Sequence, residues 1–177
     1  MGTAQPTAHE ASLLMGTTMA ISMIGIFCGI FFLFINTDLT VRITAATLVG
    51  VVGVLSFLRH SVYYESDQVR MGWRQDHKEF QLEVGYANLA IGIWALVAAA
   101  LSWGLVCGVM LATYATYLLC ALLLHLSQAW AQEDLHDPAL RERAIRSVIS
   151  TGFFVLALFG FGVVALARAG VLPFMQW

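Results

Sequence analysis

Five long apolar runs, separated by short stretches with polar residues or glycine, dominate the chain. Each run is close to the 20 or so residues that an α-helix needs to cross the hydrocarbon core of a bilayer. We therefore expect an all-α protein, a polytopic transmembrane bundle in which residues 1–177 form a single transmembrane helical domain. The spans are predicted near residues 13–35, 40–59, 81–103, 105–131 and 147–169.

The second apolar run is the weakest of the five. Asp38 and Arg42 lie at its start, and Thr40, Thr44 and Thr47 dilute its apolar character. Polar side chains that face lipid are costly. We expect other helices to enclose this span.

Composition supports a membrane protein and narrows its partners. The chain is 59% hydrophobic and 11% charged, whereas soluble domains are about a quarter charged. Its net charge is -2 and its basic residues form no stripe, so no nucleic-acid partner is expected. The expected partner is the lipid bilayer. Small residues on several helices, including the GxxxG steps Gly25–Gly29 and Gly104–Gly108, allow close helix approach and a homo-oligomer.

Positive charge is concentrated in two connections, residues 59–79 and 133–146, which hold seven of the nine basic residues. With five spans both connections lie on one side of the membrane, and the positive-inside rule places that side in the cytoplasm. The N-terminus is then inside and the C-terminus outside. We also expect short interfacial helices in these connections, one of them starting at Pro138 after Asp137.

Two ionisable residues inside the predicted spans, Glu83 and His125, require an explanation because charge in hydrocarbon is expensive. Glu83 lies about one turn into the third span. It is either an interfacial carboxylate stabilised by the helix N-terminus, or a carboxylate in a polar pocket that carries protons or binds a metal.

The fourth span carries a polar stripe. Tyr114, Tyr117, His125 and Gln128 fall on one side of a helix that advances 100° per residue. Such a stripe fits either a structural hydrogen-bond network or the wall of a water-filled path or ligand site.

The polar residues of the second, third and fourth spans lie at one depth. If these helices are neighbours, they enclose an inner-leaflet cavity near loop residues that include Arg59, Asp67 and Arg70. The residues predicted to line it are His60, Glu83, Asn88, His125 and Gln128, with Tyr114 and Tyr117 farther along.

Three functions fit this arrangement, and no catalytic residue can be named. The leading hypothesis is a small channel or transporter that moves protons or a small solute, with Glu83 and His125 as gate or relay. The first alternative is a metal- or haem-binding oxidoreductase with His60, Glu83 and His125 as ligands. The second is a structural subunit of a membrane complex. A metal ion or haem is thus a conceivable cofactor, and whether the protein is an enzyme stays open.

The run from Phe80 to Gly92, FQLEVGYANLAIG, resembles the signature stretch of a family of small uncharacterised bacterial multi-pass membrane proteins, a domain of unknown function. The resemblance implies a bacterial inner-membrane location and points to Glu83 and Asn88. The charged residues 74–79 depart from the family pattern, which puts the role of that loop in doubt.

Overall fold

The computed structural model describes residues 7–71, 78–131 and 138–171, and these residues form helices and short turns without a strand. Five helices are long and apolar enough to cross a membrane, so the protein is a multi-pass membrane protein. They are His9–Leu33, Thr37–Val62, Lys78–Ala100, Gly104–Ser127 and Val148–Arg168. Their bounds differ from the predicted ones by only a few residues. Frayed or capped ends account for differences of this size.

The helices are α1 (His9–Leu33), α2 (Thr37–Thr44), α3 (Val52–Phe57), α4 (Tyr64–Met71), α5 (Lys78–Ala100), α6 (Gly104–Ala131) and α7 (Pro138–Arg168), with the π-helical segments η1 (Ala45–Val51) and η2 (Leu58–Val62). The second span is continuous from α2 to η2. Its π-helical end is marked by the Tyr63 N–H, which donates to the Leu58 carbonyl five residues back at 2.9 Å.

The prediction that other helices enclose the second span is confirmed. Thr40 and Thr44 have no exposed surface, and half of the span's apolar window is buried. The Thr40 hydroxyl donates to the Gly29 carbonyl of α1 at 3.3 Å, and the Thr44 hydroxyl donates to Thr40 O at 2.8 Å. The threonines therefore direct their polar groups to the backbone and not to lipid.

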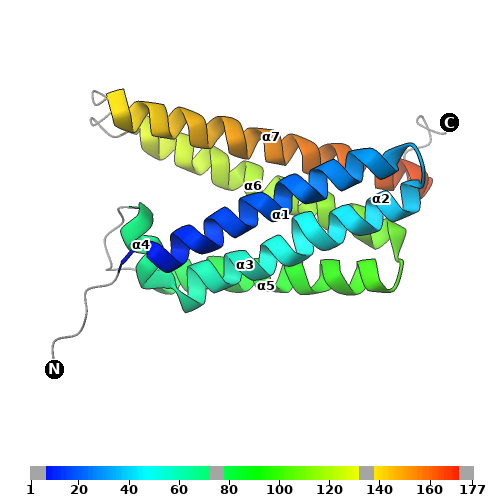
Figure 1. Cartoon of the computed structure of the whole chain (residues 1–177), viewed down its shortest axis with the longest axis horizontal. Helices are drawn as coiled ribbons and strands as arrows, with labels where there is room; N and C mark the ends of the chain where they lie inside the picture. The colour runs from blue at the N-terminus through cyan, green and yellow to red at the C-terminus, as the bar shows by residue number, and fades with distance from the viewer. Residues whose placement is uncertain (1–6, 72–77, 132–137, 172–177) are drawn as a thin grey trace.

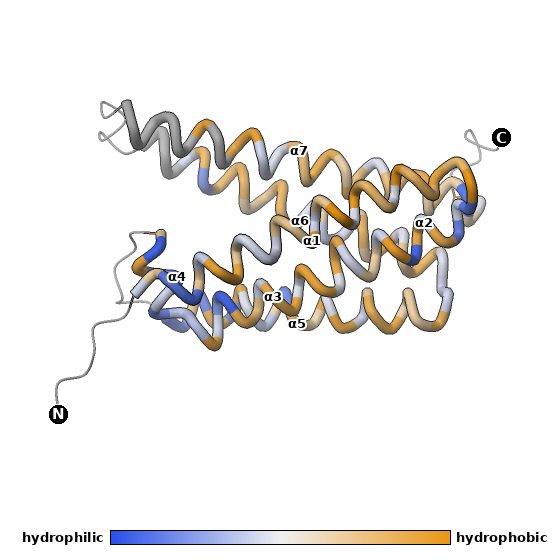
Figure 2. The backbone as a smooth tube through the Cα atoms, viewed as in Figure 1, coloured by the Kyte–Doolittle hydropathy of each residue, from blue (hydrophilic) through white to orange (hydrophobic). Residues whose placement is uncertain are grey.

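The helices run lengthwise and give the molecule two ends (Figure 1). We call the end that carries α4 and the start of α1 the α4 end. The opposite end, with the start of α2 and the end of α7, is the α2 end. Polar residues gather at both, while the middle of the bundle is mainly apolar (Figure 2).

Helix α4 and the start of α7 lie at the same end of the bundle, the α4 end (Figure 1). A short helix, α4, lies in the first charged connection as expected. In the second, the helical stretch from Pro138 forms the first turns of α7, because no helix breaker follows it before the apolar run. Asp137 lies outside the described residues. The structure contains no membrane, so the orientation with the N-terminus inside stays a prediction.

Glycines set the closest helix contacts. A Cβ at Gly92 of α5 would lie 2.9 Å from the Gly50 carbonyl oxygen and 3.2 Å from Gly53 Cα, so the two backbones touch directly. The predicted close approach at Gly25 and Gly29 is confirmed, since both are buried and a Cβ on either would overlap neighbouring side chains.

At the second GxxxG step, Gly108 packs closely against Ala165 of α7, whereas Gly104 has no neighbour within 4 Å of an added Cβ. Only half of that step is therefore a packing contact. The apolar core fills the bundle from its middle to the α2 end, with Val41, Ala45, Leu48, Val49, Val52, Ala95, Ala98, Cys107, Leu111 and Leu158 among its buried members.

Candidate functional site

A buried carboxylate, Asp67, organises the α4 end. The chain turns sharply at Tyr63 after the second span, and α4 folds back so that Asp67 is fully buried. Arg70, one turn later, donates from Nε and Nη2 to Asp67 Oδ1 at 3.0 and 2.9 Å. Gln81 Nε2 of α5 donates to Oδ2 at 3.0 Å. One side chain thus joins α4 to α5.

The second span supplies two more partners of Asp67. His60 Nδ1 lies 2.8 Å from Oδ2, and Arg59 Nε lies 3.7 Å from Oδ1. The His60 contact is close, although its angle departs from that of an ideal hydrogen bond. His60 Nε2 lies 2.9 Å from Arg59 Nη2, which can only donate, so Nε2 accepts and the ring proton belongs on Nδ1, facing the carboxylate.

These contacts keep the carboxyl ionised. Burial alone raises the pKa of Asp67, but the His60 contact and the positive charges of Arg59 and Arg70 outweigh it and lower the pKa to about 2. We call Asp67, Arg59, His60, Arg70 and Gln81 the Asp67 cluster. It is a group of charged and polar side chains at one end of a membrane bundle.

The start of α1 closes over this cluster. The Ala11 N–H donates to the Ser66 hydroxyl of α4 at 3.0 Å, and both residues are buried. Arg59 Nη1 also contacts the Met15 sulfur. Helix α1 therefore contacts this region through the backbone N–H of Ala11 and the side chain of Met15.

A second polar group lies deeper in the bundle, around Asn88 of α5. The Tyr114 hydroxyl donates to Asn88 Oδ1 at 3.0 Å, and Asn88 Nδ2 donates to the Tyr117 hydroxyl at 3.2 Å and to the Val84 carbonyl at 2.7 Å. The tyrosine rings stack with centroids 6.0 Å apart. We call Asn88, Tyr114 and Tyr117 the Asn88 network.

Arg59 interacts electrostatically with both groups. It faces Asp67, and its positive charge acts on Tyr114 and Tyr117. A line of polar side chains therefore runs from Arg70 at the α4 end to Tyr114, which is 1% exposed. Beyond Tyr114, toward the α2 end, the buried side chains are those of the apolar core together with Thr40 and Thr44.

Two acceptors near the start of this line are unsatisfied. The Oε1 atoms of Gln68 and Gln81 are buried and have no hydrogen-bond donor from the described residues. A buried amide oxygen without a partner costs free energy. Both atoms are therefore good acceptors for water or a polar solute that enters at this end.

The predicted site residues divide into two sets. Asn88, Tyr114 and Tyr117 come together as described, and His60 lies in the Asp67 cluster. Glu83 and His125 are exposed on α5 and α6 and make none of the hydrogen bonds of the Asn88 network. Gln128 belongs to helix α6, but the structure does not describe its side chain.

The metal alternative relied on His60, Glu83 and His125. Among the described residues, no three His, Cys, Asp or Glu side chains are close enough together to hold a metal ion. His60 instead uses both ring nitrogens on Asp67 and Arg59. His60 in this arrangement therefore does not favour binding of a metal ion or haem.

Sequence reasoning placed Arg59, Asp67 and Arg70 only as loop residues near the predicted cavity, and it missed Gln81. The signal that could have identified them is the spacing: Arg59 and His60 end a span, and a helix-forming stretch with the carboxylates Glu65 and Asp67 follows within seven residues. A chain that turns back there must pair the charges.

Residues 12–159 match the family described as a family of unknown function, DUF6790. The chain belongs to this family. The resemblance seen around Phe80–Gly92 is thereby confirmed, since that stretch lies within the matched residues and the family is one of unknown function. Most of this DUF6790 domain is membrane-spanning helix, and both polar groups fall inside the match. No curated protein and no solved structure matches the chain.

Proposed function

We propose that this protein is a small transporter of the bacterial inner membrane that moves a proton or a small polar solute along the line from the Asp67 cluster to the Asn88 network. The observation that carries the proposal is the Asn88 network itself. Three polar side chains from two spans lie deep in the bundle, where burying polar groups is costly and usually serves a function.

The side chains suit this role. Tyrosine hydroxyls donate and accept, and the Asn88 amide does both at once, so they can pass a proton or exchange partners with a solute. The unsatisfied oxygens of Gln68 and Gln81 offer acceptors at the entrance.

The apolar core favours a carrier over an open pore. Leu48, Leu111 and Leu158 are fully buried between the Asn88 network and the α2 end. Passage then requires a conformational change that separates these residues, as in alternating access.

The test is flux in liposomes that contain the purified full chain. Proton entry is followed with an internal pH-sensitive dye, and solute entry is followed by light scattering with urea and glycerol. We expect flux above that of empty liposomes, reduced tenfold or more by Asn88→Ala and by Tyr117→Phe. Thr116→Val is the matched control, because the Thr116 hydroxyl is exposed and bonds only the Ala112 carbonyl of its own helix.

Absence of flux for protons and both solutes would overturn the proposal, as would full flux in folded Asn88→Ala and Tyr117→Phe variants. Glu83→Gln and His125→Ala belong in the same assay. The sequence-based hypothesis expects both to abolish flux, whereas a path through the Asn88 network alone leaves flux intact.

A further inference from the structure

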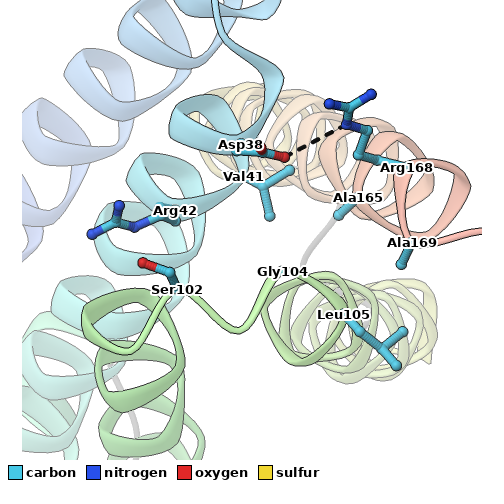
Figure 3. A pocket seen from close by; sticks show the side chains of 9 residues that line it. All are labelled: Asp38, Val41, Arg42, Ser102, Gly104, Leu105, Ala165, Arg168 and Ala169. Carbon is cyan, nitrogen blue, oxygen red and sulfur yellow. Dashed lines mark ion pairs between the residues drawn. The ribbon is translucent and has the colours of Figure 1, made fainter.

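The α2 end carries a pocket that the proposed transport path does not use (Figure 3). Its volume is about 610 Å³. The lining residues come from the start of the second span, the α5–α6 turn, and the last turn of α7: Asp38, Val41, Arg42, Ser102, Gly104, Leu105, Ala165, Arg168 and Ala169. Four of the five spans therefore contribute to it or end beside it.

The pocket has an excess of positive charge. Arg42 and Arg168 extend on opposite sides of Asp38, the single carboxylate among the lining residues (Figure 3). Arg42 is anchored, since its Nε donates to the Ala99 carbonyl at the end of α5 at 3.0 Å. Arg168 pairs with Asp38 at 3.6 Å, but both side chains are more than half exposed, so this ion pair is weak and readily exchanged.

Neutral polar groups add to the positive electrostatic potential of the pocket. The Ser102 hydroxyl is directed toward the Arg42 side of the pocket (Figure 3). The 28-residue helix α6 begins at Gly104, so the positive end of its dipole also faces the pocket. Two guanidinium groups, a hydroxyl and a helix start give the pocket a positive potential and several donors, which favours an anionic group such as a phosphate.

The apolar part of the lining distinguishes between anions. Val41 and Ala165 are buried in the wall, and Leu105 is 47% exposed at the edge. Trp103, which is 48% exposed in the adjoining turn, is typical of residues at the membrane–water interface. A freely soluble anion gains nothing from these surfaces, whereas the glycerol and upper acyl carbons of a lipid would cover them.

We propose that this pocket binds the phosphate headgroup of an anionic phospholipid, with Arg168 as the residue that contacts the phosphate and Arg42 as a second source of positive charge. Binding displaces Asp38 from Arg168. The bound lipid then ties the start of the second span to the end of α7, which are otherwise joined at this point by the exposed Asp38–Arg168 pair.

The test is a titration of the full chain in a neutral detergent with short-chain phosphatidylglycerol, phosphatidylcholine or inorganic phosphate, with binding read by native mass spectrometry. We expect phosphatidylglycerol to bind most tightly. Arg168→Gln is expected to weaken it about fivefold, the effect of one basic residue at an anionic lipid surface. Asp38→Asn is expected to strengthen binding, because it removes the competing carboxylate.

Lys78→Gln, which removes one exposed charge at the α4 end, is the matched control and is expected to leave binding unchanged. Arg42 also bonds the Ala99 carbonyl, so its removal can impair folding. The second arginine is therefore tested by Arg42→Lys, which keeps the positive charge. Equal binding of the two lipids, or no response to Arg168→Gln and Asp38→Asn, would overturn the proposal. Inorganic phosphate that binds as tightly as the lipid would show a soluble-anion site instead.

Discussion

At the scale of the residue, Asp67 is the side chain on which the α4 end depends. It faces Arg59, His60, Arg70 and Gln81 and has no contact with solvent. Removing one member of a buried ion pair leaves the other charge buried without a partner. The resulting loss of stability is larger than the stability that the intact pair contributes. The Asp67 cluster is therefore a point at which small chemical changes have large effects on stability.

The depressed pKa of Asp67 gives a pH dependence with a defined sign. A carboxyl whose pKa falls from an unfolded value of about 4 to about 2 on folding stabilises the fold above pH 4, and this contribution is lost as the pH falls through 2. It amounts to about 2 kcal/mol. We expect the stability difference between the wild type and Asp67→Asn, measured by unfolding in detergent, to shrink by this amount between pH 5 and pH 2.

Asp38→Asn is the comparison, because Asp38 pairs with Arg168 on an exposed surface. This variant is expected to follow the wild type through the same acid range. A difference between wild type and Asp67→Asn that does not change with pH would show that the carboxyl does not titrate in this interval.

At the scale of the element, the crossing of the second span with α5 is set by backbone contact at Gly53 and Gly92. The nearest atoms to a Cβ at Gly92 are backbone atoms, which cannot move aside without shifting a whole helix. The same two elements carry His60 and Gln81 of the Asp67 cluster. Their separation therefore controls the geometry of that cluster.

Gly92→Ala is expected to destabilise the protein by about 1–3 kcal/mol, since an added methyl group overpacks a contact that cannot relax. The measurement is thermal or denaturant unfolding in detergent. Gly160→Ala in α7 provides the matched control, because nothing lies within 4 Å of its added Cβ. That variant is expected to be neutral or to gain up to about 1 kcal/mol from helix propensity. Equal stability of the two variants would contradict the tight crossing.

The elements were predictable from the sequence because each span needs only length and apolar composition. The partners of Asp67 were not predictable, because the sequence does not show that the chain turns back at Tyr63 and places α4 at the end of the bundle. Asn88 and the two tyrosines were found because an amide and hydroxyls within apolar runs are conspicuous. Glu83 was equally conspicuous, yet it lies near the end of its helix, where an exposed carboxylate can reach water.

At the scale of the whole molecule, an odd number of spans puts the N-terminus and the C-terminus on opposite sides of the membrane. The start of α1 lies at the α4 end and the end of α7 lies at the α2 end (Figure 1). The described basic residues Arg59, Arg70 and Lys78 lie at the α4 end, so we expect from the positive-inside rule that this end faces the cytoplasm.

Reporter fusions test this orientation directly. A reporter that is active only in the cytoplasm is expected to work when placed before Met1 and to fail after Trp177, and a reporter that is active only outside is expected to show the reverse. Activity of one reporter at both ends would mean an even number of spans, and the opposite pattern would mean an inverted protein.

The Asp67 cluster has a further consequence for how the protein is made. Among the described residues, the side chains that face the carboxylate lie between Arg59 and Gln81 along the chain, and Ala11 and Met15, which close over the cluster, come earlier still. All of these residues precede α6, so the contacts of the Asp67 cluster can form while the ribosome is still synthesising α6.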